Sequence, residues 1–153
     1  SNIGQLIIDF ASGNLKSYVS GAYDFVDVRD VARGLILAAE KGQTGRHYIL
    51  SGEQVQVPEL MNELAVDIGY PAPTYRIPTA IARAAGVLAS VYYRLLRRPP
   101  VFTAYSIDVL NSNSQVNSTR AKEELGFTHR PWRESIHDQV EWFRANGMLP
   151  RRR

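Results

Sequence analysis

Few residues in this chain have the types and spacing that catalytic chemistry needs. The three histidines, His47, His129 and His137, do not lie at the spacings of metal ligands. No serine stands in a Gly-x-Ser-x-Gly turn, and no glycine-rich phosphate loop occurs. Glu123 and Glu124 are adjacent carboxylates on a predicted solvent-facing helix, whereas general acid or base catalysis needs a buried one. The sequence therefore predicts no catalytic residue and no metal ligand.

Two aspartates in the stretch Asp-Phe-Val-Asp-Val-Arg-Asp at 24–30 are candidates for a defined polar role. Asp27 precedes a helical pattern as an N-cap does, and Asp30 occupies the acidic position of a capping box. Capping alone explains both residues and contributes about 1 kcal/mol. Contact between Asp27 and a substrate is the alternative interpretation.

Aromatic residues are the other candidates for binding, because they combine apolar area with a polar handle. Packing in the core is the alternative for each aromatic side chain. With Asp27 included, we expect a substrate pocket to be lined by Tyr18, Tyr23, Phe25, Asp27, Phe102 and Tyr105.

The elements around these candidates are organised on residues 24–52. Aromatic and β-branched residues at 24–27 predict a strand, and the run 47–50 predicts a second, buried strand. Between them, helical spacing predicts a helix from Val28 to Lys41 that Gly42 ends. Its apolar stripe consists of Val28, Val31, Ala32, Leu35, Ile36 and Ala39.

The rest of the chain alternates between amphipathic segments and turn residues. We expect an α+β fold with several helices and few short strands, in one domain that spans residues 1–153. Periodicity and turn residues predict helices at 3–12, 58–68, 79–96, 102–111, 119–125 and from Pro131, and strands or extended segments at 16–19, 55–57, 74–78 and 115–117. Pro58 and Ser118 should begin two of these helices, and Gly69 and Gly126 should end them. The apolar stripes of three helices are Leu6, Ile7 and Phe10, then Leu60, Met61, Leu64, Ala65 and Ile68, and finally Trp132, Ile136, Val140 and Phe143.

Composition limits the function classes. With 44% hydrophobic and 22% charged residues, the chain is globular. The absence of cysteine excludes disulfides and thiolate metal sites, and no signal peptide opens the sequence, so we expect a cytoplasmic protein. The net charge of +3 comes from scattered or terminal residues, so we expect no nucleic-acid partner.

One stretch, 80–96, is apolar enough to raise the question of a membrane. Arg83 and Arg94 interrupt it, whereas a spanning helix needs about 20 apolar residues, so we expect no transmembrane segment. The interpretation that we favour is a helix buried in the core or against a partner. Peripheral contact with a membrane is the alternative.

Six short motifs stand in order along the chain. Phe-Val-Asp-Val-Arg-Asp-Val-Ala at 25–32 opens the central helix, Lys-Gly-x-x-Gly ends it, and Tyr-Ile-Leu-x-Gly follows at 48–52. Arg-Ile-Pro at 76–78, Ser-x-Arg-Ala-x-x-x-Leu-Gly-Phe at 118–127 and Val-x-Trp-Phe-x-x-x-Gly at 140–147 come later. This set resembles the C-terminal half of extended short-chain dehydrogenase/reductases, the NAD-dependent epimerase/dehydratase superfamily. Its dihydroflavonol-reductase-like and hopanoid-associated sugar-epimerase-like branch is the most similar.

The resemblance implies a longer parent with a Rossmann-type α/β fold. This chain would then be the substrate-binding lobe, and 47–50 would be a late strand of the parent's nucleotide-binding sheet. The parent would use NAD or NADP, which such proteins hold with a Gly-x-x-Gly-x-x-Gly turn, and a catalytic Tyr-x-x-x-Lys pair. Neither motif occurs here. We therefore expect the isolated chain to bind no cofactor and to be inactive.

The parent's reaction is predicted from one position at which this chain differs from related epimerases. Related nucleotide-sugar epimerases carry an arginine for the substrate diphosphate where this chain has Tyr23, and a tyrosine makes no bidentate charged contact. This favours reduction or oxidation of a hydroxyl/carbonyl pair on an apolar or aromatic substrate.

Three alternatives remain. The parent could be a nucleotide-sugar epimerase or dehydratase, or the chain could be a stand-alone non-catalytic binding module or, more remotely, a basic nucleic-acid binder. For a half-enzyme we expect self-association through the exposed surface that the nucleotide-binding half would cover, including Val31, Leu35 and Ile36.

Overall fold

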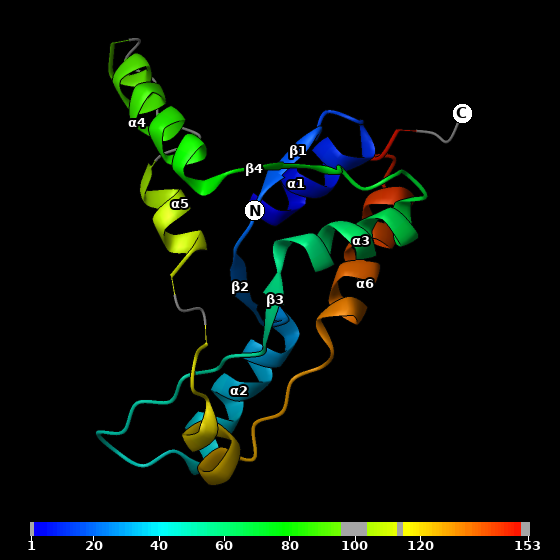
Figure 1. Ribbon diagram of the computed structural model, residues 1–153. Coiled ribbons are helices and arrows are strands. Elements are labelled where there is room, and N and C mark those ends of the chain that lie inside the picture. Colours follow the sequence, from blue (N-terminus) through cyan, green and yellow to red (C-terminus); the bar gives the residue numbers. More distant parts are fainter. Residues whose placement is uncertain (1, 96–103, 113–114, 151–153) are drawn as a thin grey trace. The chain divides into compact units, whose positions relative to one another are not determined.

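The computed structural model describes residues 2–95, 104–112 and 115–150. Helices and short strands follow one another along the chain (Figure 1), so the predicted mixture of several helices with few strands is confirmed. The chain divides into two compact units, each described by itself below. Unit 1 comprises Ser1–Tyr23, Gln56–Ser114 and Leu149–Arg153, and unit 2 comprises Asp24–Val55 and Gln115–Met148.

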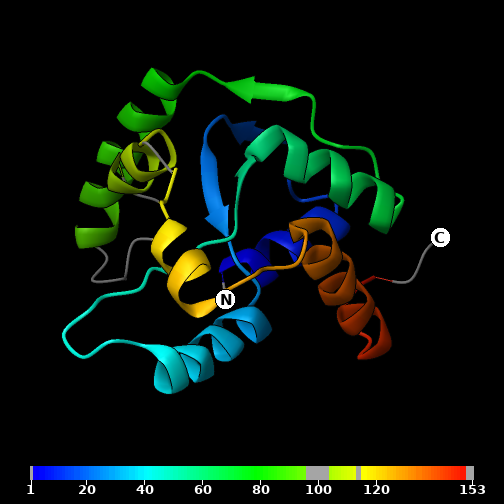
Figure 2. The ribbon, with the colours of Figure 1, turned by 90° about the horizontal axis from the view of Figure 1, so that it is seen from below.

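Unit 1 contains a two-stranded sheet and four helices among the described residues. Strand β1 (Ser17–Val19) pairs in parallel with β4 (Tyr75–Ile77), so that Tyr18 lies opposite Arg76. Helix α3 (Val57–Ile68) packs against α1 (Asn2–Ala11) and β1. The last two helices of unit 1 are α4 (Thr79–Leu95) and α5 (Ala104–Leu110). They contact each other and lie next to one another in Figures 1 and 2.

The core of unit 1 follows the predicted helical stripes. Pro58 stands in the first turn of α3, and Gly69 ends the helix in the left-handed conformation with φ 74°. The ring of Tyr70 then meets Phe10 edge-on, with ring centroids 6.2 Å apart. The buried side chains on α1 and α3 are Ile7, Phe10, Leu60, Met61, Leu64 and Ile68.

Unit 2 contains α2 (Val28–Lys41), the single π-helical turn η1 (Ala121–Leu125) and α6 (Trp132–Ala145). The four side chains predicted to face inward on α6 are buried: Trp132, Ile136, Val140 and Phe143. A second small core joins α2 to η1, and it consists of Ala121, Leu125 and Phe127 packed with Val26, Leu37, Ala38, Tyr48 and Leu50. The remaining strands, β2 (Ala22–Phe25) and β3 (Glu53–Gln56), form a second two-stranded sheet.

Helix α2 has two faces of different character. Its buried residues are Asp30 and Gly34, and a Cβ at Gly34 would lie 2.7 Å from a methyl carbon of Leu50. Most of the predicted apolar stripe lies on the opposite side and is exposed, with Leu35 62% and Ile36 60% accessible, whereas Val31 is half-buried. We call the exposed set the α2 apolar face; it consists of Val28, Ala32, Leu35, Ile36 and Ala39.

Two predicted strands are absent within the described chain. Residues 47–50 have no strand assignment, and His47 and Ile49 are exposed rather than buried. A strand needs a hydrogen-bonded neighbour, and residues 2–95, 104–112 and 115–150 provide none for this segment. Its pairing in a parent sheet therefore stays a prediction. Residues 115–117 also form no strand. The capping hydrogen bond predicted for Ser118 is made by the residue before it: the Asn117 side chain accepts from the Thr119 amide at 2.8 Å.

In the ranges that the structure describes, the helices are too short or too polar to cross a bilayer. This agrees with the prediction from the arginines that interrupt residues 80–96.

Candidate functional site

The aromatic candidates occupy several elements. Tyr18 is half-buried on β1, and Tyr105 on α5 is 76% exposed. Tyr23 and Phe25 are two residues apart on β2, so their side chains share one face of that strand. Partial burial raises the pKa of the Tyr23 phenol. Phe102 lies outside the described residues, so its predicted role stays a prediction, as does the lining role of the other four.

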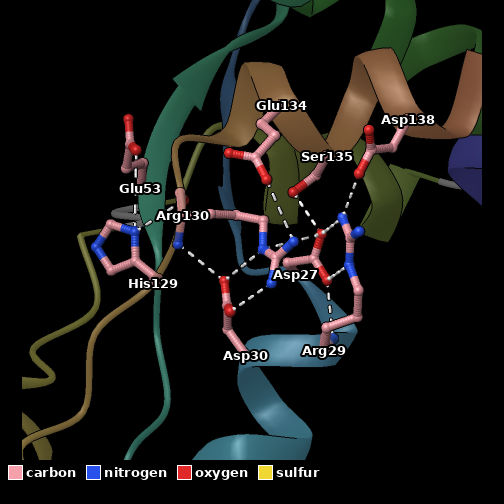
Figure 3. Close-up of polar contacts among 9 residues, drawn as sticks. All are labelled: Asp27, Arg29, Asp30, Glu53, His129, Arg130, Glu134, Ser135 and Asp138. Carbon is pink, nitrogen blue, oxygen red and sulfur yellow. Dashed lines mark hydrogen bonds and ion pairs between the residues drawn. The ribbon is translucent and has the colours of Figure 1, made fainter.

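Asp27 is the N-cap of α2, as predicted. Its carboxylate accepts a hydrogen bond from the Arg29 amide at 2.8 Å and two more from the Arg29 guanidinium at 2.9 and 2.7 Å. The Ser135 hydroxyl on α6 donates to the same carboxylate at 2.6 Å (Figure 3). Four donors therefore engage a carboxylate whose side chain is only 6% exposed.

Asp30 is held by a residue 100 positions later in the sequence. Arg130 binds it through the backbone amide at 2.8 Å and through two guanidinium nitrogens at 3.1 and 3.0 Å (Figure 3). This is the bidentate arrangement that makes arginine–carboxylate pairs strong. Arg130 also donates to Glu134 at 3.3 Å and lies 3.7 Å from Asp27, so it joins α2 to the start of α6.

The same cluster extends to the surface of α6. Arg29 forms an ion pair with Asp138 at 2.7 Å in addition to its contacts with Asp27. Beside the cluster, the His129 ring lies 3.9 Å from Glu53 (Figure 3). We call the central set the α2–α6 polar network; it consists of Asp27, Arg29, Asp30, Arg130, Glu134, Ser135 and Asp138.

The electrostatics of the α2–α6 polar network favour a structural role. Hydrogen bonds from the Arg29 side chain, followed by Ser135, hold the pKa of Asp27 far below its usual range. Hydrogen bonds from the Arg130 side chain likewise lower the pKa of Asp30. A carboxylate that stays ionised and fully hydrogen-bonded is a poor proton donor or acceptor near neutral pH. The network therefore clamps α2 to α6, and contact between Asp27 and a substrate stays a prediction.

A second clamp holds the end of β2. Asp24 accepts hydrogen bonds from the Ser51 hydroxyl at 2.5 Å and from the Gly52 amide at 3.2 Å. Ser51 is buried, and a Cβ at Gly52 would lie 1.9 Å from the Phe25 carbonyl oxygen. Only glycine fits a backbone approach this close. The glycine of the Tyr-Ile-Leu-x-Gly motif is thus required by the close packing next to Phe25.

The sequence analysis missed most of the α2–α6 polar network. It identified Asp27 and Asp30 as capping residues but assigned no role to Arg29, Arg130, Ser135 or Asp138. The sequence showed only that Arg130 stands directly before Pro131, at the start of the final helix. No spacing or motif indicated that this arginine meets Asp30.

One open hollow of about 380 Å³ lies in unit 2, between the segment 47–49 and the start of η1. Arg120 at its wall donates to the His47 carbonyl oxygen at 3.2 Å, and Glu124 accepts from the Tyr48 hydroxyl at 2.7 Å. None of the predicted substrate-lining residues lines it. Among the residues that the structure describes, no cluster of histidine and carboxylate side chains could hold a metal ion.

The closest sequence match to a dinucleotide turn does not fit a dinucleotide. Gly42 and Gly45 follow the end of α2, where the Gly42 amide donates to the Ala38 carbonyl oxygen and the Gln43 amide donates to the Tyr48 hydroxyl. A pyrophosphate site needs free backbone amides at the start of a helix. These two amides are already engaged at the end of one.

Comparison with known proteins identifies relatives of this chain. No family model matches it. Sterol demethylase protein B of Methylococcus capsulatus is 36% identical over 151 residues, which are 97% of this chain and 46% of that protein. A putative dihydroflavonol 4-reductase of Synechocystis is 26% identical over 150 residues, 95% of this chain and 44% of that protein.

A solved structure shows the same arrangement. The crystal structure of a nucleoside-diphosphate-sugar epimerase from Pseudomonas aeruginosa matches with a TM-score of 0.73 and 28% identity, over 96% of this chain and 43% of that one. The chain spans about half the length of the curated relatives it matches. By this sequence and structural similarity, it belongs to the NAD-dependent epimerase/dehydratase superfamily.

Proposed function

We propose that this chain is the C-terminal, substrate-binding half of an NAD(P)-dependent oxidoreductase that interconverts a hydroxyl and a carbonyl group. The observation that carries the proposal is the α2 apolar face. It exposes Leu35 and Ile36 in a chain that covers less than half of its relatives' length. An apolar surface of this kind is typical of an interface, and the missing nucleotide-binding half is its natural occupant.

The cofactor and the proton relay belong to that other half. This chain has no Gly-x-x-Gly-x-x-Gly turn and no Tyr-x-x-x-Lys pair, and the amides at Gly42 and Gln43 are engaged. Its contribution would be to position and enclose the substrate. Tyr18, Tyr23, Phe25 and Tyr105 would supply the aromatic lining, and no step of the reaction would use a charged group from the α2–α6 polar network.

An apolar substrate is favoured over a nucleotide sugar. By the resemblance, Tyr23 takes the place of the arginine with which related epimerases hold a diphosphate, and partial burial raises the pKa of its phenol above the ordinary value. The names of two relatives refer to a sterol and to a dihydroflavonol. The epimerase from Pseudomonas aeruginosa supports the second candidate, a nucleotide-sugar epimerase or dehydratase.

The first test is to sequence the coding DNA upstream of Ser1. We expect an in-frame Gly-x-x-Gly-x-x-Gly turn early and a Tyr-x-x-x-Lys pair shortly before Ser1. The complete chain should then oxidise NADPH or NADH in the presence of an apolar cyclic ketone and leave UDP-glucose unchanged. Turnover of UDP-glucose alone would establish the epimerase candidate. A stop codon directly before Ser1 would contradict the half-enzyme proposal and favour a stand-alone binding module.

The interface part of the proposal has its own test in the isolated chain. We expect the 153-residue chain to self-associate, and Leu35→Glu with Ile36→Glu to shift it to a monomer in sedimentation velocity. Val66→Glu is the matched control, because Val66 on α3 is 77% exposed and lies outside the α2 apolar face. A wild-type chain that stays monomeric across a wide concentration range would contradict self-association.

A further inference from the structure

The charge distribution of this chain is uneven in a way that the proposed function does not explain. Residues 68–107 contain no aspartate or glutamate, although the chain has 15 of them. The same 40 residues contain five arginines, Arg76, Arg83, Arg94, Arg97 and Arg98. They therefore carry a charge of +5, and the other 113 residues together carry −2. The net positive charge of this one segment therefore exceeds that of the whole chain, which is +3.

This segment includes a helix pair with several exposed apolar side chains. Along α4, Ala82 and Gly86 are buried, whereas Ile81 is 61% and Val87 53% exposed, with Ala84 and Ala85 also exposed between them. On α5, which packs beside α4, Tyr105 and Val109 are exposed. We call Ile81, Val87, Tyr105 and Val109 the α4–α5 outer face.

The polar residues next to this face are few. Arg83 lies on α4 between the exposed apolar positions and forms an ion pair with Asp108 of α5 at 3.3 Å, and both side chains are more than half exposed. Asp108 is the first acidic residue after Asp67, and it stands at the end of the acid-free segment. The exposed apolar and aromatic side chains thus belong to a segment whose sequence is cationic, and the acidic group described beside them is paired with Arg83.

From this combination we infer that the α4–α5 outer face docks on the surface of an anionic lipid bilayer. Apolar and aromatic side chains of such a helix enter the boundary between headgroups and acyl chains, and arginines beside them are attracted to anionic headgroups. The absence of acidic residues over 40 positions removes the repulsion that such a surface would otherwise meet. The described helices are too short or too polar to span the bilayer, so the helix pair would lie along it.

The inference does not depend on which reaction the protein serves. It uses only α4, α5 and the charge of residues 68–107, whereas the α2 apolar face belongs to unit 2. A failed half-enzyme proposal would leave the bilayer inference standing, and a failed bilayer inference would leave the half-enzyme proposal standing.

The test is flotation of the complete chain that the gene encodes, with two kinds of vesicle. One kind contains phosphatidylcholine alone, and the other contains phosphatidylcholine and phosphatidylglycerol in equal amounts. We expect the protein to float with the mixed vesicles, to remain behind with phosphatidylcholine alone, and to be released as salt is raised, because salt screens exposed charges. No flotation with the mixed vesicles, or flotation that ignores both lipid charge and salt, would overturn the inference.

Variants separate the apolar contribution from the charge. Ile81→Ser with Val87→Ser should lower the partition constant about tenfold or more, because each side chain loses apolar burial in the bilayer. Arg83→Gln should lower it about fivefold and Asp108→Asn should raise it about fivefold, since each changes the charge beside the face by one unit in opposite directions.

Val66→Ser is the control, because it removes an even more exposed apolar side chain from α3. Its partition constant should equal that of the wild type, and circular dichroism should show that all the variants keep their helices. An equal loss in Val66→Ser and in the double variant would refute the assigned face. The assigned partner would also be refuted if the protein bound no vesicles and the double variant converted a dimer into a monomer. In that case a second copy of the chain would cover the face.

Discussion

Two regions of the molecule use their side chains in opposite ways. At the start of α2, ionised groups of both signs lie within hydrogen-bonding distance, and Asp27 and Asp30 are almost fully removed from solvent. Along the outer side of α4, apolar groups face solvent and acidic residues are absent from the surrounding sequence. The charged groups of the first region are paired within unit 2, whereas the apolar side chains of the second region are exposed in unit 1.

The two regions should therefore affect different properties: the α2–α6 polar network should affect folding stability, and the exposed apolar side chains should affect association. Substitutions in the α2–α6 polar network should change the free energy of unfolding and leave partners unaffected. Substitutions on an exposed apolar face should do the reverse, because removing an exposed side chain usually changes stability by no more than about 0.5 kcal/mol. Each prediction below tests one side of this contrast, and the largest effect comes first.

Arg130→Met should destabilise the chain most. It leaves the Asp30 carboxylate, 9% exposed at its side chain, without its bidentate partner. Removing this arginine should lower the unfolding free energy by more than the loss of a helix cap does, measured by urea denaturation. Arg33→Met is the matched control, because Arg33 is an exposed arginine on the same helix. Equal stability of the two variants would contradict the clamp.

Asp27 allows the cap to be separated from the ion pair. Asp27→Ala should cost about 1–2 kcal/mol, because the Arg29 amide and the Ser135 hydroxyl lose their acceptor. Asp27→Asn keeps a good N-cap oxygen and should recover about half of that loss in thermal unfolding. If both variants lose the same amount, the charge rather than the cap stabilises α2.

The pH dependence of stability should come from the same pair of aspartates. The folded-state pKa values of Asp27 and Asp30 lie below those of the unfolded chain, so their stabilisation is fully present above the unfolded pKa of about 3.9. It is lost as the pH falls through the folded values. We expect constant stability between about pH 6 and pH 5 and a progressive fall below about pH 4.

Asp30→Asn tests the origin of this slope. The variant removes one of the two depressed carboxyl groups, so its stability should fall less steeply with acid than that of the wild type. Leu35→Ser, on the α2 apolar face, should keep the wild-type slope. An unchanged slope in Asp30→Asn would assign the acid sensitivity to other carboxylates.

Local signals were enough to predict most of the helices. Asp27 as the cap of α2, Gly69 as the end of α3 and Gly126 as the left-handed residue after η1 each depend on a residue type at a helix boundary. The final helix was predicted with its four buried positions. These features depend on neighbours within a few residues, which a sequence contains directly.

Contacts over long sequence distances were not predictable in the same way. Arg130 and Asp30 are 100 residues apart, and no periodicity connects them. The segment 47–50 has the composition of a strand, but its exposure depends on whether a sheet is beside it. For α2, apolar spacing predicted the stripe, but not that Asp30 and Gly34 would form the buried face while Leu35 and Ile36 stayed outside.

The two faces of α2 also set how freely this helix can change over evolution. One side is fixed by the ion pair at Asp30 and by the close approach at Gly34, where any added carbon would meet Leu50. The other side is fixed if an interface covers Leu35 and Ile36. A surface helix ordinarily drifts fastest on its outer side. With such an interface, neither side of α2 is available for neutral drift, and the segment should accumulate substitutions as slowly as the interior does.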